Sequence, residues 1–269
     1  MKPMPPFEEI VRMRIVHRVP GTDRVQVDRG RSYKSANGGA LLADVYRPAG
    51  AAAPCPAVVL IHGGPVPTGS TPKDMGCFVS WGETLAASGL AAVTFNHRFY
   101  GGAQLLEAAR DVEDAVAWVR SEAAQLGIDS TRLALWAFSG GGPFLSLALR
   151  EGAPTFRALV AYYAALDLRE RPPDPGAPIS DEDRLALSPA HHVESGRPVP
   201  PVLVARAGFD HPFLNGTIDR FIAAALAHNA PLEAINHPDG RHGFDILDDD
   251  PRSREIAART LEFLRTHLA

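Results

Sequence analysis

The sequence has few cysteines and no long apolar run. Its 269 residues include only Cys55 and Cys77, which lack the C-x-x-C spacing of metal or redox sites. Two thiols are too few for a disulfide framework, so we expect free thiols and a cytoplasmic location. The N-terminal stretch MKPMPPFEEIVRMRI lacks the apolar core of a signal peptide, and no apolar run approaches the roughly 20 residues of a membrane helix. These absences predict a soluble protein that does not associate with membranes.

The sequence also lacks any long run of charges of one sign. Its formal net charge is −4, with 27 Lys and Arg residues against 31 Asp and Glu residues, and both kinds are spread along the chain. A surface that binds nucleic acid or anionic lipid needs a cluster of basic side chains. We therefore expect no nucleic-acid or membrane partner, and a substrate that is not a polyanion.

Apolar residues are abundant enough for one large core. Hydrophobic residues make up 45% of the chain and charged residues 22%, which is typical of a globular protein of this length. We predict a single domain over residues 1–269. The segment at about 169–200 is rich in proline, glycine and charge, and we interpret it as a short lid or cap with one short helix.

Strand-like and helix-like segments alternate from Pro56 onward. The predicted strands are AVVLIH, LAAVTFN, LALWAF, RALVAYYAALDL, PVLVARAG and LEAINH. Helices are predicted near 78–88, at 103–124, at 215–227 and after Pro251. This alternation is typical of an α/β fold with a mainly parallel sheet and helices on both faces. Earlier in the chain, EIVRMRIVHRV and LLADVYRP are predicted as strands, the second as a half-exposed edge.

The stretch LALWAFSGGGPF places a serine between a buried strand and three glycines. Leu133–Phe138 is a continuous apolar run, which indicates a strand that is central in the sheet. Gly140–Gly142 permit a sharp turn, and Pro143 is tolerated in the first turn of a helix. Ser139 therefore lies where the nucleophile stands in the G-x-S-x-G elbow, with Ala137 in place of the first glycine. The alternative is a buried serine in an ordinary strand-to-helix turn.

A serine nucleophile needs a histidine base that is oriented by a carboxylate. The strand PVLVARAG is followed by FDHP, so Asp210 comes just past a carboxyl end, where open α/β sheets assemble sites. INHPDGRHGFD places both His237 and His242 after the last strand. The chain order Ser139, Asp210, His242 is the order of the α/β hydrolases. Asp167 remains an alternative acid, His237 an alternative base, and a helix N-cap an alternative role for Asp210.

Taken together, these motifs resemble the α/β-hydrolase superfamily of serine hydrolases, in its esterase, dienelactone-hydrolase-like and prolyl-oligopeptidase-like branches. The resemblance covers most of the chain and depends on LLADVYRP, LIHGGP, RDVEDAVAWV, LALWAFSGGG, SPAHHV and HGFD. It implies the α/β-hydrolase fold and an oxyanion hole built from the backbone N–H groups of Gly64 and Gly140, with Gly63 as a further candidate. Pro65 has no N–H to contribute. Dienelactone hydrolases use a cysteine, so Ser139 resembles the esterases instead.

The resemblance implies a carboxylic ester hydrolase that acts on a small-molecule ester through Ser139, His242 and Asp210, with no cofactor and no metal. The lack of a large N-terminal propeller favours esters over peptides. A peptidase or amidase on short substrates is the alternative enzyme, and a catalytically silent hydrolase fold that binds a ligand or partner is the alternative outside enzymes. A homodimer through the edge strand or the terminal helix stays open.

Overall fold

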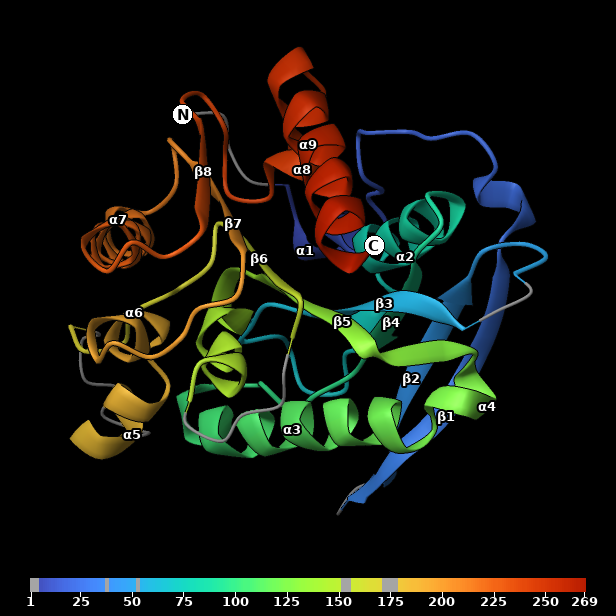
Figure 1. The fold of residues 1–269 in the computed structure, drawn as a ribbon, viewed down its shortest axis with the longest axis horizontal. Coiled ribbons are helices and arrows are strands. Elements are labelled where there is room, and N and C mark those ends of the chain that lie inside the picture. The colour runs from blue at the N-terminus through green and yellow to red at the C-terminus, as the bar shows by residue number, and fades with distance from the viewer. Residues whose placement is uncertain (1–4, 37–38, 52–53, 151–155, 171–178) are drawn as a thin grey trace.

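A twisted eight-stranded sheet with helices against both faces dominates the computed structural model (Figure 1). The structure describes residues 5–36, 39–51, 54–150, 156–170 and 179–269. The strands are β1 (Gln26–Ala36), β2 (Gly39–Arg47), β3 (Cys55–Ile61), β4 (Ala91–Phe95), β5 (Ile128–Phe138), β6 (Ala158–Tyr162), β7 (Val202–Ala207) and β8 (Leu232–His237). They lie in the order β1-β2-β4-β3-β5-β6-β7-β8.

Most neighbouring strands in this sheet run parallel. Only β1 with β2 and β2 with β4 pair antiparallel, and the other five pairs are parallel. The predicted α/β class with a mainly parallel sheet is therefore confirmed. β5 lies between β3 and β6, in the middle of the sheet, as the unbroken apolar run Leu133–Phe138 predicts. The carboxyl ends of β5, β7 and β8 consequently meet at one edge.

Helices cover both faces of the sheet. The α-helices are α1 (Phe7–Ile10), α2 (Gly76–Ala87), α3 (Leu105–Ser121), α4 (Ala123–Leu126), α5 (Asp181–Ala186), α6 (Pro189–Glu194), α7 (Pro212–Ala227), α8 (Phe244–Leu247) and α9 (Pro251–Leu268). The 3-10 helices are η1 (Thr22–Arg24), η2 (Pro72–Asp74), η3 (Gly102–Gln104) and η4 (Ser139–Ala148). In Figure 1, α2 and α9 lie on one side of the sheet and α3 on the other.

Alternate residues of each strand pack against the two helical layers. On β3, Val58 and Leu60 join the buried cluster formed with α2, α8 and α9, whereas Val59 and Ile61 join the cluster formed with α3, η4, α6 and α7. A strand that is apolar on both faces needs a continuous apolar sequence, and β3 has one. The two cores thus hold the strands, and the loops after them, in place.

The terminal helix begins as its sequence predicts. The Asp250 carboxylate accepts a hydrogen bond from the Ser253 backbone N–H at 2.8 Å, and Pro251 occupies the first turn. A side-chain oxygen at this position satisfies one of the free N–H groups of the first turn. The prediction of a helix after Pro251 is confirmed.

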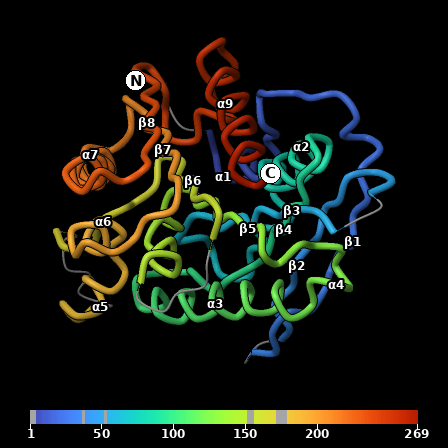
Figure 2. The backbone as a smooth tube through the Cα atoms, viewed as in Figure 1, coloured from blue at the N-terminus to red at the C-terminus, as the bar shows by residue number. Residues whose placement is uncertain are grey.

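The predicted strand EIVRMRIVHRV is wrong. The segment begins with the last two residues of the short helix α1 and continues as an irregular stretch that lies against α2 and α8. Its apolar residues alternate, but its backbone bonds to α2 and α8 instead of to a neighbouring strand. Ser80 Oγ of α2 accepts from the Ile15 N–H at 3.0 Å, and the Asp245 carbonyl of α8 accepts from the Val16 N–H at 2.8 Å. Figure 2 shows the chain leaving α1 and passing along the α2 side before it reaches β1.

The outer strands also differ from the prediction. β1 falls in the polar segment that we did not assign to the sheet, and it forms the edge in place of LLADVYRP. Most β1 side chains are at least partly exposed, so the strand needs no apolar alternation. LLADVYRP lies in β2, which pairs with β1 and β4 and buries Ala43–Tyr46.

The excursion at about 169–200 contains two short helices, α5 and α6, where one was predicted. Residues 171–178 of this predicted lid lie outside the described part of the chain. α6 packs against α7 and η4, and the Ala190 N–H donates to the Leu166 carbonyl at 2.9 Å. The described helices of the excursion are therefore tied to the α3 face of the sheet.

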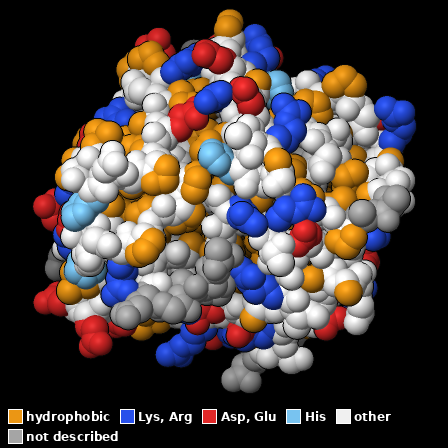
Figure 3. All heavy atoms as spheres, in the orientation of Figure 1, with side chains coloured by type: hydrophobic (Ala, Val, Ile, Leu, Met, Phe, Trp, Pro, Cys, Tyr) orange, Lys and Arg blue, Asp and Glu red, His pale blue; other side chains and the backbone are white. Residues whose placement is uncertain are grey.

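The surface carries both kinds of charge. On the face drawn in Figure 3, Lys and Arg side chains are interspersed with Asp and Glu side chains. Within the described ranges, no helix has the length and apolar character that crossing a bilayer requires.

Candidate active site

Ser139 lies on a sharp corner between β5 and η4. Its φ of 52° is in the left-handed region, which non-glycine residues seldom adopt, while the preceding Phe138 is extended at φ −119°. The Ala165 N–H donates to the Ser139 carbonyl at 2.9 Å and holds the corner against the loop after β6. Such strained backbone often occurs at functional sites, and this corner has the geometry of a nucleophile elbow.

The three glycines after Ser139 pack closely against the backbone of two neighbouring loops. A Cβ on Gly140 would overlap the carbonyl oxygen of Gly64, and one on Gly141 would stand 2.6 Å from the carbonyl oxygen of His62. A Cβ on Gly142 would overlap the carbonyl oxygen of Ala165. Real Cβ atoms do not approach this closely, so glycine at these positions lets the loops after β3 and β6 pack directly on the elbow.

The structure brings Ser139, His242 and Asp210 together. His242 Nε2 lies 2.8 Å from Ser139 Oγ, and His242 Nδ1 lies 2.7 Å from Asp210 Oδ2. The Asp210 carboxylate only accepts hydrogen bonds, so Nδ1 carries the proton and Nε2 is left to accept from the Ser139 hydroxyl. The Asp210 side chain is 3% exposed and that of His242 is 30% exposed. The imidazole therefore has a buried orienting partner and an open side toward the solvent.

Asp210 does not cap the helix that follows it. His211 stands at the N-cap of α7, where its Nδ1 accepts from the Phe213 N–H at 3.2 Å. The second carboxylate oxygen of Asp210 accepts from the His211 backbone N–H at 2.6 Å. This bond fixes the carboxylate so that its other oxygen faces His242.

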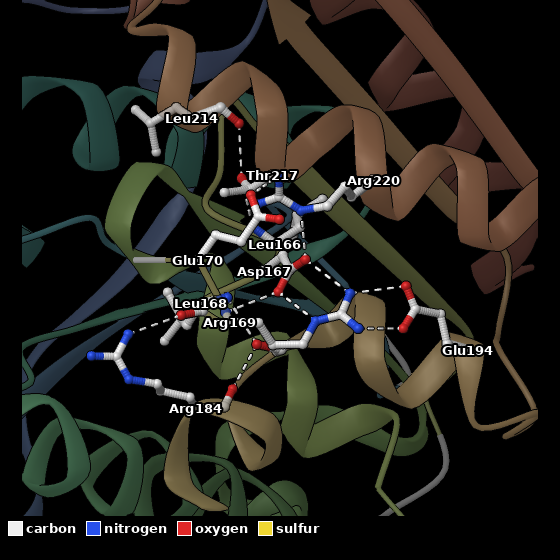
Figure 4. A network of polar contacts seen from close by, with 11 residues as sticks. Leu166, Asp167, Leu168, Arg169, Glu170, Arg184, Glu194, Leu214, Thr217 and Arg220 are labelled. Carbon is white, nitrogen blue, oxygen red and sulfur yellow. Dashed lines mark hydrogen bonds and ion pairs between the residues drawn. The ribbon is translucent and has the colours of Figure 1, made fainter. Parts of the chain in front are cut away.

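Asp167, the alternative acid, belongs to a different network (Figure 4). Arg169 and Arg220 both donate to its carboxylate, at distances of 2.7 to 2.9 Å, and Arg169 also reaches Glu194. Burial alone would raise the pKa of Asp167, but the hydrogen bonds from the two arginines outweigh it and hold the pKa at about 2. Its partners are therefore arginines and not His242.

This network predicts that Asp167→Asn lowers stability. The folded-state pKa is depressed from 3.8 to about 2, so the ionised carboxylate contributes stability above pH 4 that is lost as pH falls toward 2. We expect urea unfolding at pH 7 to show a loss of about 2 kcal/mol, and the difference from wild type to shrink below pH 4. Asp219→Asn is the control, because Asp219 is half-exposed in its pair with Arg206 and should change stability by less than about 0.5 kcal/mol. Equal stability of Asp167→Asn and wild type at pH 7 would contradict this account.

The other histidines near the strand ends have structural partners. His237, the alternative base, is buried, and its Nε2 lies 3.0 Å from Ser253 Oγ on α9. His62 stacks on His97 with ring centroids 3.5 Å apart, and its Nδ1 lies 2.6 Å from the Gly63 carbonyl oxygen. Burial lowers the pKa of His62 to about 4, so it is neutral at pH 7. It therefore stabilises the loop that carries Gly63 and Gly64.

The loop after β3 faces the elbow. A Cβ on Gly63 would stand 2.8 Å from Ser139 Cβ, and Gly64 lies against Gly140. Neither the Gly63 nor the Gly64 N–H donates a backbone hydrogen bond within the described residues. The loop thus places free backbone donors beside the serine, next to the start of η4.

A cavity of about 340 Å³ opens beside Ser139, within the size range of small-molecule sites. Apolar side chains make up most of its wall, among them Met75, Phe78, Phe138 and Ile246. His242 and the glycine loop also line it. No described residue of the excursion at 169–200 lines the cavity. Within the described chain, no group of three or more His, Cys, Asp or Glu side chains is arranged to hold a metal ion.

A buried polar group under the cavity was not found from the sequence. Asp245, in the HGFD motif, accepts from Tyr163 Oη at 2.7 Å and from Trp81 Nε1 at 2.9 Å. Burial raises the pKa of Asp245. The Tyr163 ring packs on the His242 ring, with centroids 4.7 Å apart. Tyr163 has a φ of 39°, and nothing in the sequence RALVAYYAALDL predicts this left-handed conformation.

Comparisons with known proteins agree on the fold. Residues 43–163 match the family model BD-FAE. The native esterase Est2 from the Planctomycetes species Thermogutta terrifontis is similar, with a TM-score of 0.74, 22% identity and 96% of each chain covered. Its form phosphorylated by paraoxon has a TM-score of 0.69 at 23% identity, covering 90% of this chain and 92% of that chain. A mutant of the esterase rPPE has a TM-score of 0.73 at 21% identity, covering 93% of this chain and 86% of that chain. No curated protein sequence matches the chain.

Proposed function

We propose that this chain, which has the α/β-hydrolase fold, is a serine esterase that cleaves small carboxylic esters through Ser139, His242 and Asp210. The observation that carries this proposal is the pair of contacts at His242, which joins a strained serine on one side to a buried carboxylate on the other. A serine hydroxyl is a weak nucleophile unless such a base takes its proton.

The first half of the reaction is acyl transfer to the serine. His242 Nε2 takes the proton of Ser139 Oγ as that oxygen bonds to the ester carbonyl carbon, and Asp210 stabilises the imidazolium that forms. The carbonyl π electrons move to its oxygen, which becomes the oxyanion of a tetrahedral intermediate. When the intermediate collapses, His242 gives its proton to the leaving alkoxide, and an acyl-serine and an alcohol result.

The second half releases the acid. His242 takes a proton from water as the water oxygen bonds to the acyl carbon, and the tetrahedral intermediate forms again. It collapses as His242 returns the proton to Ser139 Oγ, which frees a carboxylic acid. In both halves the backbone N–H groups of Gly64 and Gly140 stabilise the oxyanion, with Gly63 as the neighbouring donor. No cofactor takes part in these steps.

The cavity supports an uncharged ester as substrate. Its wall is mostly apolar, and its acidic side chain, Asp245, is occupied by Tyr163 and Trp81. The similar solved structures named above are esterases, one of them in a form that is phosphorylated by paraoxon. A cytoplasmic location remains our prediction. The oligomeric state stays open, with a homodimer as one candidate.

Hydrolysis of p-nitrophenyl esters from acetate to decanoate tests the proposal, with the matching p-nitroanilides measured in parallel. We expect turnover of at least one ester in the series and much slower turnover of the anilides. Turnover of the anilides with none of the esters would replace the esterase by an amidase. No turnover of either series by folded protein would favour a binding protein.

A further inference from the structure

One wall of the cavity comes from a segment that has no part in the triad. Phe7 and Ile10 of α1 line the cavity that also contains Ser139 and His242. Both lie more than a hundred residues before the serine, and Ile10 falls within the stretch that the sequence predicted as a strand. Their position beside the nucleophile is therefore a feature of the tertiary structure alone.

The segment after α1 is fastened to the elements that carry the rest of the cavity. The Gly76 N–H donates to the Val11 carbonyl at 2.8 Å, at the start of α2. Ile15 bonds to Ser80 of α2, and Val16 bonds to the backbone of Asp245 in α8. These bonds hold residues 11–16 in place, and α1 immediately precedes them.

A glycine permits this close attachment. A Cβ on Gly76 would stand 2.6 Å from the carbonyl oxygens of Arg12 and Met13. Any side chain there would push the segment away from α2. Arg14 also pairs with Glu83 of α2. The backbone of the segment thus packs directly on the first turn of α2, which contributes Cys77 and Phe78 to the cavity.

The apolar side chains of α1 lack a partner in the core. None of the four residues of α1 is buried, and Phe7 is 40% exposed. Its neighbours in the cavity wall include Val66, Met75 and Ile246, which are also apolar. Such a surface gains free energy when hydrocarbon covers it. Because the surface is continuous with the site at Ser139, the group that covers it belongs to a molecule bound at the serine.

We propose that α1 forms part of the substrate subsite, in which Phe7 and Ile10 contact the hydrocarbon chain of the ester and set the chain length that the enzyme prefers. This inference rests on the proposed function and adds the substrate class, which is esters whose acyl or alcohol part is a hydrocarbon chain longer than acetyl or methyl. The segment that covers the substrate is then the N-terminal one, whereas the sequence predicted the excursion at 169–200.

The chain-length profile of variants tests the inference. We expect Phe7→Ala with Ile10→Ala to lower the ratio of kcat/KM for a long ester to that for the shortest ester of the same series by about tenfold, because contact with several methylenes is lost. Two substrate series locate the chain: p-nitrophenyl esters vary the acyl part, and alkyl acetates vary the alcohol part. A lowered ratio in either series supports the subsite and says which part it holds.

Phe7→Trp tests the subsite by adding volume to it instead of removing contacts. The larger ring fills part of the cavity, so we expect the preferred chain to become shorter than in wild type. Leu226→Ala is the matched control, because Leu226 is 68% exposed on α7 and does not line the cavity. It should leave the profile unchanged. Identical profiles of wild type and all α1 variants in both series would overturn the inference.

A binding measurement separates this inference from the proposed function. Calorimetry with octanoate on Ser139→Ala protein needs no turnover, and adding the two α1 substitutions should raise the Kd about tenfold. Weakened octanoate binding with no ester turnover by wild type would support the apolar subsite and reject the esterase. Ester turnover by wild type with octanoate affinity and chain-length profiles that do not change would support the esterase and reject the subsite.

Discussion

Ser139→Ala lowers kcat for p-nitrophenyl esters by roughly 10³-fold or more, while the protein still folds. The alanine removes the oxygen that His242 Nε2 contacts at 2.8 Å, and the described lining of the cavity holds no other serine or threonine. Water then has to attack the ester directly, aided only by binding and by the oxyanion donors. Initial rates of p-nitrophenol release from wild type and variant measure the effect.

The control for this variant is Ser146→Ala. Ser146 is a buried serine on the same segment η4, and its Oγ has no hydrogen-bond partner within the described residues. Its replacement removes a hydroxyl from the same element without touching His242, so kcat should stay within about threefold of wild type. Equal turnover by Ser139→Ala and wild type would remove Ser139 from the mechanism.

Asp210→Asn lowers kcat by roughly 10⁴-fold with little change in stability. The carboxylate accepts from His242 Nδ1 at 2.7 Å, and that bond keeps the proton on Nδ1 so that Nε2 can act as the base. An amide at this position can donate to Nδ1 instead, which favours the wrong tautomer. It also carries no charge to stabilise the imidazolium.

Asp167→Asn is the matched comparison, since both aspartates follow strands of the same sheet. We expect Asp167→Asn to lose stability and to keep kcat within about threefold. Asp210→Asn should instead keep its stability and lose most of its kcat. Ester kinetics and urea unfolding of both variants give the four values. A large fall in kcat for Asp167→Asn, with full activity in Asp210→Asn, would exchange their roles.

The central elements could be predicted because their signals are local. The Leu133–Phe138 part of β5 is apolar without interruption because both of its faces are covered, and α9 begins after Asp250 because that side chain satisfies one of the free N–H groups of the first turn. The N-terminal segment could not be predicted in this way. Its backbone partners are Gly76, Ser80 and Asp245, and no pattern within the segment identifies groups so distant in the sequence.

The candidate site likewise has residues that could be predicted from the sequence and residues that could not. Ser139, Asp210 and His242 were chosen because each follows a strand and because their order along the chain is that of the α/β hydrolases. The structure brings these three side chains within hydrogen-bond distance, and their catalytic roles are our proposal. The contacts of Phe7 and Tyr163 with the cavity depend on how α1 and the loop after β6 pack, so neither residue stands out in the sequence.

The most direct test of the account is covalent labelling of the protein by a fluorophosphonate, followed by peptide mass spectrometry. The reagent reacts with a serine only when a base activates it, so it reports the assembled triad without any assumption about the natural ester. We predict one adduct per chain on the peptide that contains Ser139, slow labelling of Asp210→Asn, and no adduct on that peptide in Ser139→Ala. Unlabelled Ser139 in folded wild-type protein, or equal labelling of wild type and Asp210→Asn, would contradict the proposed mechanism.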